Sequence, residues 1–260
     1  MNYKQLTSIY FSPTGSTKAV AELIAAQIPG QKESLDLTEA SKTRPDYRFT
    51  ENEVVLVGVP VYGGRVPETA IERFQKLQGR QTPAILLVTY GNRAYEDALL
   101  ELKQVLKERG FRPMSAAAVV TEHSIVRSIA AGRPDAHDRE LLAQYGQRLA
   151  QQLADVRCNY EIPDLVVKGN YPYKERHVLP LKIKVSSSCT GCGTCIRSCP
   201  VQAISCTDPK VMDEARCIYC MRCVQVCPVG GRKLGTLTQL MIAQKLKKVC
   251  ADRKEPEFIV

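Results

Sequence analysis

The stretch "SSSCTGCGTCIRSCP" at residues 186–200 contains four cysteines separated by two, two and three residues and followed by a proline. The same spacing returns at residues 215–228, in "ARCIYCMRCVQVCP". Each cysteine of the first stretch has a counterpart 28 residues later, from the pair Cys189 and Cys217 to the pair Cys199 and Cys227. An offset this regular indicates that one supersecondary unit has been duplicated.

This cysteine spacing is that of bacterial ferredoxins with two 4Fe–4S clusters, in which the fourth cysteine of each motif binds the other cluster. Three closely spaced cysteines hold three corners of a cubane, and the fourth corner is reached from the other half. We therefore expect one cluster on Cys189, Cys192, Cys195 and Cys227, and a second on Cys217, Cys220, Cys223 and Cys199.

A zinc ion suits this cysteine spacing less well than a cluster does. Zinc sites use pairs of cysteines separated by a longer loop, not runs of four that end in a proline. Gly191 and Gly193 lie between the cysteines, where backbone amides are expected to approach cluster sulfurs. Three cysteines lie outside the repeat and are interpreted as ordinary thiols: Cys158, Cys206 and Cys250.

Length and composition limit the kind of protein. The chain has 260 residues, of which 44% are hydrophobic and 24% charged, as is ordinary for a globular protein of one or two domains. No run reaches the roughly 18 apolar residues of a membrane span, and the N-terminus lacks the pattern of a signal peptide. We therefore expect a cytoplasmic protein, in which cysteines more often bind metals than form disulfides.

The net charge of +9 is distributed unevenly. Residues 1–155 carry 19 Lys and Arg against 18 Asp and Glu, a net charge of +1, whereas residues 156–260 carry 17 against 9, a net charge of +8. Two oxidised clusters with four thiolates each would contribute roughly −2 apiece and cancel about half of this excess. We therefore expect redox protein partners and no nucleic acid. The basic C-terminal tail either docks an acidic partner or is a solvated helix face.

Strand and helix patterns alternate five times in the first 155 residues. Such alternation predicts an α/β fold, a parallel sheet with helices on both faces. We expect strands at 4–11, 33–37, 53–60, 82–90 and 114–122, and helices at 16–28, 67–78, 94–109 and 135–155.

The loop "SPTGST" (12–17) lies between the first strand and the first helix. There it presents backbone N–H groups, hydroxyls and a helix N-terminus, which together suit a phosphate. It is neither a Walker A loop nor the G-x-G-x-x-G fingerprint. No Lys or Arg lies within it, so it suits a monoester phosphate held by neutral donors. The alternative is that Ser16 only caps the helix.

Two further loops follow neighbouring strands, "PVYGGRVP" (60–67) and "TYGNRAY" (89–95). In a doubly wound sheet of order 2-1-3-4-5, these loops and the loop 12–17 meet at the carboxyl edge, where such sheets bind ligands. Their glycines allow the backbone to approach a planar ring closely, and their tyrosines offer stacking faces.

Residues 1–155 resemble a flavodoxin, whose phosphate loop has the pattern Ser/Thr-x-Thr-Gly-x-Ser/Thr and binds FMN. The resemblance implies phosphate binding by Ser12, Thr14, Gly15, Ser16 and Thr17. It implies that the isoalloxazine ring lies against Pro60, Val61, Tyr62, Gly63, Gly64, Arg65, Thr89, Tyr90, Gly91, Asn92 and Tyr95. Many flavodoxins stack a tryptophan on the flavin, but this chain has none, so either a tyrosine serves or one face of the ring is covered in another way. Arg65 would favour the anionic reduced ring if it points at the flavin; otherwise it is a surface arginine.

The whole chain resembles the fused flavodoxin–ferredoxin proteins. We expect four parts: a flavodoxin-like FMN-binding domain (1–155), a linker (156–184), a small α+β ferredoxin domain with two 4Fe–4S clusters (185–232), and a basic helical tail (233–260). The linker is expected to wrap over a domain, because residues 156–184 are rich in Tyr, Pro and Lys and have no clear period. No catalytic set of residues is visible, and the three histidines are isolated in sequence.

The expected function is electron transfer between FMN and two clusters, in an anaerobe because such clusters are often oxygen-sensitive. The alternatives are a flavin-dependent reductase of a small acceptor, an NAD(P)H-linked oxidoreductase that takes hydride from NAD(P)H, and a redox sensor that binds a partner or nucleic acid through the basic tail.

Overall fold

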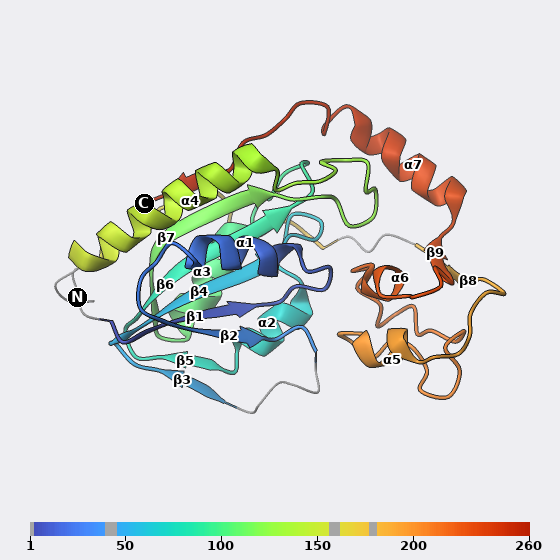
Figure 1. Cartoon of the computed structure of the whole chain (residues 1–260), viewed down its shortest axis with the longest axis horizontal. Helices are drawn as coiled ribbons and strands as arrows, with labels where there is room; N and C mark the ends of the chain where they lie inside the picture. The colour runs from blue at the N-terminus through green and yellow to red at the C-terminus, as the bar shows by residue number, and fades with distance from the viewer. Residues whose placement is uncertain (1–2, 40–45, 156–161, 177–180) are drawn as a thin grey trace.

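The computed structural model describes residues 3–39, 46–155, 162–176 and 181–260, which form a large α/β unit followed by a small cysteine-rich unit (Figure 1). Its strands are β1 (Gln5–Tyr10), β2 (Gln31–Asp36), β3 (Tyr47–Phe49), β4 (Glu53–Pro60), β5 (Leu77–Gly79), β6 (Thr82–Tyr90), β7 (Phe111–Val120), β8 (Ile183–Val185), β9 (Arg232–Leu234) and β10 (Glu257–Ile259). Its helices are α1 (Ser16–Ala25), α2 (Glu68–Phe74), α3 (Ala98–Glu108), α4 (Ala136–Asp155), α5 (Thr194–Ser198), α6 (Arg222–Gln225) and α7 (Thr236–Lys247).

The main sheet has the order β10-β7-β6-β4-β1-β2. Its five parallel strands are the five expected from the sequence, so the predicted order 2-1-3-4-5 and the flavodoxin-like α/β fold are confirmed. Two features were not predicted from the sequence: the antiparallel sixth strand β10, and a separate parallel pair formed by β3 and β5.

Helices cover both faces of the sheet. The apolar sides of α1 and α4 pack against one face of the sheet, through residues such as Ile24 and Leu149. The apolar sides of α2 and α3 pack against the other face, through residues such as Phe74 and Leu102. Strand β6 is buried along its whole length, as expected for a central strand covered on both sides. Because the five strands run parallel, their carboxyl ends all lie at one edge of the sheet. This edge faces the cysteine-rich unit (Figure 1).

The cysteine-rich unit repeats its local structure. Helix α5 follows Gly193 at φ 72°, and α6 follows Met221 at φ 62°. The residue before each short helix thus has the same left-handed (αL) backbone conformation. Strands β8 and β9 pair antiparallel at one end of the unit, and its small core contains Cys195, Ile204 and Cys223.

The described part of the linker, residues 162–176, forms a strap over the α/β unit. Asp97 accepts hydrogen bonds from the backbone N–H groups of Asn170 (2.8 Å) and Lys174 (2.7 Å). Leu165 is 7% exposed and belongs to the core on the α2–α3 face. These contacts agree with the expected wrapping; the remaining linker stretches 156–161 and 177–180, and with them Cys158, lie outside the described residues.

The C-terminal tail is only partly helical, which corrects the expectation for 233–260. After α7 the chain returns to the α/β unit, where β10 pairs with β7. Phe258 stacks on Tyr145 with ring centroids 4.4 Å apart, and Ser115 Oγ donates to the Ile259 carbonyl at 2.6 Å. The edge of β7 offers unpaired backbone groups that a returning segment can satisfy. Strand β10 has only three residues, too few for an alternating pattern that would have predicted it from the sequence.

Candidate redox-cofactor sites

The loop after β1 has the geometry of an anion site. Gly15 precedes α1 at φ 83°, and a side chain there would meet nothing within 4 Å, so the loop is open on that side. The first N–H groups of a helix lack intrahelical partners and point outward from its N-terminus. Thr14 Oγ1 and Ser16 Oγ lie 3.3 Å apart beside this opening. The loop therefore fits a phosphate.

Ser12 has the capping role that the alternative interpretation assigned to Ser16. Its Oγ accepts from the Lys18 backbone N–H at 3.0 Å, and α1 has no side-chain cap at Gly15. Ser12 is itself held by a hydrogen bond from its backbone N–H to Thr38 Oγ1 at 2.8 Å. The hydroxyl of Ser16 is therefore not used by the helix.

Thr17 differs from the other residues of the loop. It is fully buried, and its hydroxyl lies 2.7 Å from the Thr89 hydroxyl, at the end of β6. This hydrogen bond joins the first predicted loop to the third. Thr17 therefore positions the loops, and the open hydroxyls are those of Thr14 and Ser16.

The loop after β4 is a tight turn. Tyr62 and Arg65 exchange two backbone hydrogen bonds, of 3.0 and 3.2 Å, across Gly63 and Gly64. Both glycines have positive φ, 62° and 89°. A side chain at 64 would overlap the Glu96 carboxylate, whereas one at 63 would meet open space. The turn is held against its neighbour by the Val61 N–H, which donates to the Thr89 carbonyl at 2.8 Å.

Arg65 points away from this turn. Its Nε and NH2 groups donate to the Glu101 carboxylate at 2.9 and 2.6 Å, and its guanidinium lies 4.8 Å from the centroid of the Tyr173 ring. Glu101 is 3% exposed and also accepts from Arg176 at 2.8 Å. Arg65 therefore anchors the strap, and neither expectation for its role, flavin contact or free surface arginine, describes this position.

Two of the three expected tyrosines belong to the core. Tyr90 and Tyr95 are 5% and 6% exposed and contact each other edge to face, with ring centroids 5.5 Å apart. Burial raises the pKa of Tyr90 to about 12. Tyr95 donates to the Glu257 carboxylate at 2.9 Å. The third, Tyr62, is a half-buried residue at the sheet edge.

The loop after β6 is covered by the C-terminal segment. Asn92 is 4% exposed, has φ 63°, and donates from Nδ2 to the carbonyls of Cys250 and Asp252, both at 3.0 Å. Its Oδ1 is buried without a partner among the described residues, so this loop retains an unused acceptor. Gly91 lies against the His123 ring, whose Nδ1 accepts from the N–H groups of Ile125 and Val126. No sequence pattern predicted this cover.

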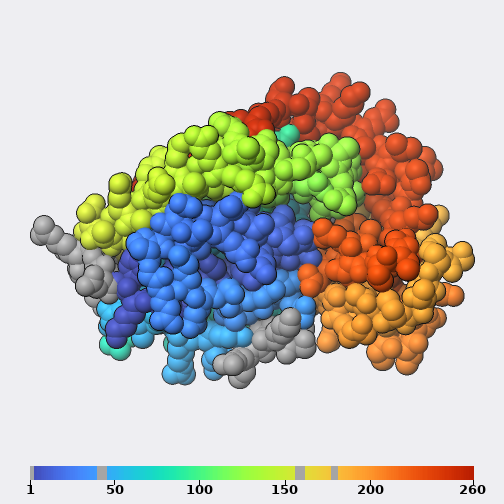
Figure 2. Space-filling model, in the orientation of Figure 1, coloured from blue at the N-terminus to red at the C-terminus, as the bar shows by residue number. Residues whose placement is uncertain are grey.

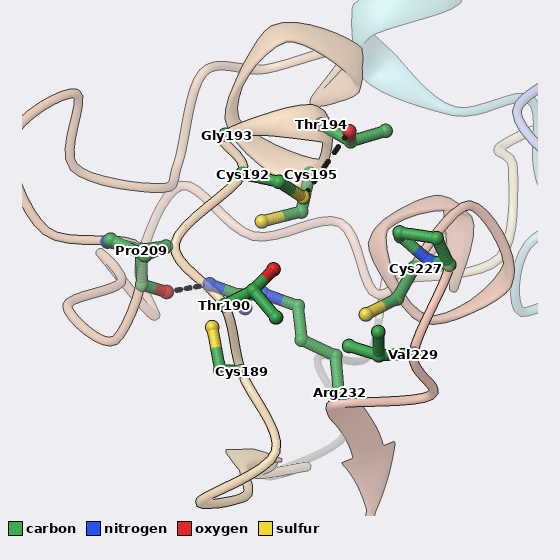
Figure 3. A pocket seen from close by; sticks show the side chains of 11 residues that line it. Cys189, Thr190, Cys192, Gly193, Thr194, Cys195, Pro209, Cys227, Val229 and Arg232 are labelled. Carbon is green, nitrogen blue, oxygen red and sulfur yellow. Dashed lines mark hydrogen bonds between the residues drawn. The ribbon is translucent and has the colours of Figure 1, made fainter.

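The eight motif cysteines surround two pockets. The first pocket is lined by Cys189, Cys192, Cys195 and Cys227 (Figure 3). The second is lined by Cys199, Cys217, Cys220 and Cys223. The structure thus groups the cysteines as the crossed arrangement predicts, with one cysteine of each motif in the other's pocket.

Both pockets suit a cluster more than a single ion. Sulfurs around one tetrahedral ion lie about 4 Å apart, and no three Cys, His, Asp or Glu side chains of the described ranges are grouped to hold one ion. The crossing sulfurs already accept backbone hydrogen bonds. Cys199 accepts from the Ala203 N–H at 3.3 Å, and Cys227 accepts from the Gly231 N–H at 3.1 Å.

The thiols of the second pocket lie in the less polar environment. Burial raises the pKa of Cys223 to about 11 and raises that of Cys220 well above its ordinary value. In the first pocket, the Thr194 hydroxyl 3.4 Å from Cys192 lowers the pKa of that thiol. Since cluster iron binds thiolates, burial makes the second pocket the harder one to deprotonate without metal.

The second motif touches the flavodoxin-like loops. Arg222 donates from NH1 to the Pro13 carbonyl at 2.9 Å and from NH2 to Glu39 at 3.0 Å. Ile218 packs against the α2–α3 core. Tyr62 lies close enough to Cys220 for the thiolate charge to add to the effect of burial, which raises the tyrosine pKa well above its ordinary value. Figure 2 shows the orange cysteine-rich unit pressed against the blue N-terminal part.

Comparisons with known proteins agree with this division. Residues 8–117 match the model of a flavodoxin domain, and residues 188–231 match that of a 4Fe-4S dicluster domain. The chain thus joins a flavodoxin domain to a 4Fe-4S dicluster domain, as the resemblance implied. The first domain implies FMN and the second implies two 4Fe–4S clusters. Within the described ranges, no helix is long and apolar enough to cross a bilayer.

Similar proteins are known for the flavodoxin part. A segment of 97 residues, 37% of this chain, is 30% identical to the sulfite reductase [NADPH] flavoprotein alpha-component of Vibrio parahaemolyticus and covers 16% of that protein. The Vibrio vulnificus protein of the same name is 30% identical over 87 residues, 14% of its length. The chain therefore spans a small part of these relatives. Among solved structures, flavodoxin 1 of Bacillus cereus has a TM-score of 0.40 and 18% identity, and the match covers 59% of this chain and 99% of that one.

Proposed function

We propose that this protein relays electrons between an FMN bound at the sheet edge and two 4Fe–4S clusters, with the cluster of the second pocket nearer the flavin. FMN exchanges one or two electrons and each cluster exchanges one, so the combination couples one-electron to two-electron steps. The main support is the pair of hydrogen bonds that Arg222 makes to Pro13 and Glu39, because Arg222 stands between two cysteines of the second pocket.

The chain's own residues support distinct roles around the flavin. Thr14, Gly15 and Ser16 form the open phosphate loop, and Thr17 links that loop to the end of β6. Tyr62 is the half-buried tyrosine at the sheet edge and lies beside Cys220. The open side of the tight turn at Gly63 lets the backbone approach a planar ring. These residues thus contribute the position of the flavin and access to it.

The two connections between the domains support a fixed separation. The strap is held by the buried Glu101 and by Asp97 on one side. On the other side, the segment after α7 binds loop 89–95, and Lys254 Nζ donates to the carbonyls of Asn92 and Arg93. Electron tunnelling needs a short and constant distance. A cysteine-rich unit held against the flavodoxin-like unit by the strap before it and by the segment after it meets that need. A unit joined by one unattached linker would not.

Cofactor content tests the first part of the proposal. Anaerobically purified protein is expected to contain about eight irons per chain, from two clusters, together with bound FMN. Protein that takes up neither under reconstitution would contradict the proposal. Reduction of the flavin by NADH or NADPH alone would instead favour a nicotinamide-linked reductase, the reaction class in the name of the Vibrio relatives.

A cysteine variant tests the relay itself. Cys199→Ala is expected to empty the second pocket and to abolish flavin reduction by a bulky protein donor such as reduced ferredoxin. Dithionite, which is small enough to reach the flavin directly, should still reduce it. Equal rates of flavin reduction by the protein donor in the wild type and the variant would show that electrons enter at the flavin and bypass the clusters.

A further inference from the structure

A buried arginine lines the first pocket, whereas no charged side chain of the described ranges lines the second. The charge of this arginine also acts, from further away, on Cys217 and Cys223 of the second pocket. Arg232 is 2% exposed, lines the first pocket and extends among its cysteines (Figure 3). Its NH2 donates to the Pro209 carbonyl. Its Nε and NH1 are buried and have no hydrogen-bond partner among the described residues. Two nitrogens of one guanidinium, which carry three N–H donors, are therefore unused inside a pocket lined by four cysteines.

The duplication shows what Arg232 replaces. The residue 28 positions earlier is Ile204, which is 4% exposed and lines the second pocket. Thr190 of the first pocket likewise corresponds to Ile218 of the second. Besides its cysteines, the second pocket is lined by apolar residues only: Ile183, Pro200, Val201, Ala203, Ile204, Met212, Ile218 and Met221.

Cluster chemistry explains the unused donors. Buried N–H groups without an acceptor are costly, and cluster sulfides and thiolates accept hydrogen bonds. One-electron reduction makes a cluster more negative by one charge, and no proton is required. A guanidinium in contact therefore stabilises the reduced form more than the oxidised form, as do hydrogen bonds to sulfur and solvent exposure. Cys192 of the first pocket is exposed, whereas Cys220 and Cys223 of the second are buried.

We propose that Arg232 raises the reduction potential of the cluster in the first pocket above that of the cluster in the second. This inference rests on the cluster ligation proposed above. Arg232 keeps its positive charge throughout, and each site takes up a single electron. The duplicated unit then has two unequal sites: an outer site of higher potential and an inner apolar site of lower potential beside the flavin loops.

Potentiometric titrations followed by electron paramagnetic resonance test the proposal on the whole protein. The variant Cys199→Ala isolates the first cluster, and Cys227→Ala isolates the second. The first cluster should have the higher potential. Adding Arg232→Gln should lower the potential of the first cluster clearly and that of the second less, and Arg232→Lys should restore most of the difference because it keeps the charge.

Three outcomes would overturn the inference: equal wild-type potentials for the two clusters, no shift on Arg232→Gln, or equal shifts of both clusters. If the Arg232→Gln protein loses the first cluster, two measurements still test the role of Arg232. These are the difference between the two cluster potentials in protein with Arg232 intact, and the potential of the first cluster in Arg232→Lys. Iron content measured on the same samples separates this failure from failure of the proposed function. Wild-type protein without two clusters would contradict the function, whereas two clusters of equal potential would contradict only the role of Arg232.

Discussion

The two halves of the cysteine-rich unit have the same ligand spacing and different surroundings. Each half supplies three cysteines to one pocket and one to the other, and each crossing sulfur accepts one backbone N–H. Yet the first pocket contains Arg232, and the second is apolar and lies against the flavodoxin domain. Duplication therefore preserved the residues that bind and varied those around them. This is how two sites of one origin acquire unequal properties.

The largest expected effect comes from breaking the crossed ligation. Cys199→Ala should remove the cluster of the second motif while leaving that of its own motif, and Cys227→Ala should do the reverse. About half of the iron is expected to remain in each variant, since each pocket holds one cluster. Iron analysis and the paramagnetic resonance of the reduced protein measure this. Loss of the cluster of the mutated residue's own motif would show that ligation is not crossed.

The next effect concerns the packing of the second half. Ile218→Ala removes a half-buried side chain that contacts the α2–α3 core and should lower the free energy of unfolding by about 1.5 kcal/mol. Thr190→Ala, at the exposed counterpart position in the first half, should change stability by less than about 0.5 kcal/mol. Urea unfolding followed by cluster absorbance compares the two. Equal midpoints of unfolding for the two variants would show that the contact of Ile218 with the flavodoxin domain contributes no measurable stability.

Arg222 offers a comparison with Thr194, its counterpart 28 residues earlier. Arg222→Ala loses a charged hydrogen bond to the Pro13 carbonyl in the phosphate loop, which should raise the dissociation constant of FMN about tenfold. Thr194→Ala, which lies in the other half, should leave FMN affinity unchanged. Fluorescence titration of flavin-free protein measures both. If Arg222→Ala binds FMN as tightly as the wild type, the second motif does not shape the phosphate loop.

The smallest effect is expected where the halves differ by one methyl group. Gly231 corresponds to Ala203, and a Cβ at 231 would lie 3.3 Å from Cys189 Cα. Gly231→Ala should therefore cost about 1 kcal/mol, because the Cys189 backbone must give by a few tenths of an ångström. Its neighbour Gly230 has φ 58° in open space, so Gly230→Ala should cost more, because of its backbone conformation alone. The rate of iron release to a chelator ranks the two. The reverse order would mean that contact with Cys189, rather than backbone strain, limits this turn.

The sequence predicted the sheet order and the grouping of the cysteines. Both depend on patterns with short repeats: alternation of strands and helices, and fixed gaps between ligands. The roles of single side chains were predicted less well. Tyr90 and Tyr95 looked like flavin contacts because they flank a loop, but β6 is buried on both faces and draws Tyr90 into the core. Arg65 binds a carboxylate on α3, which lies 36 residues further along the chain.

The amino-acid sequence alone determined the class of this protein: a flavodoxin domain joined to a dicluster domain. Local periodicity and ligand spacing can be read from the sequence without any knowledge of long-range contacts. The tertiary structure alone decided which cysteine pocket lies beside the loop 12–17, where the segment after α7 returns as β10, and what surrounds each pocket. Those features depend on contacts between residues far apart in sequence, such as Arg222 with Pro13 and Phe258 with Tyr145. Such contacts leave no local pattern, because packing and charge pairing act between surfaces that only the folded chain brings together.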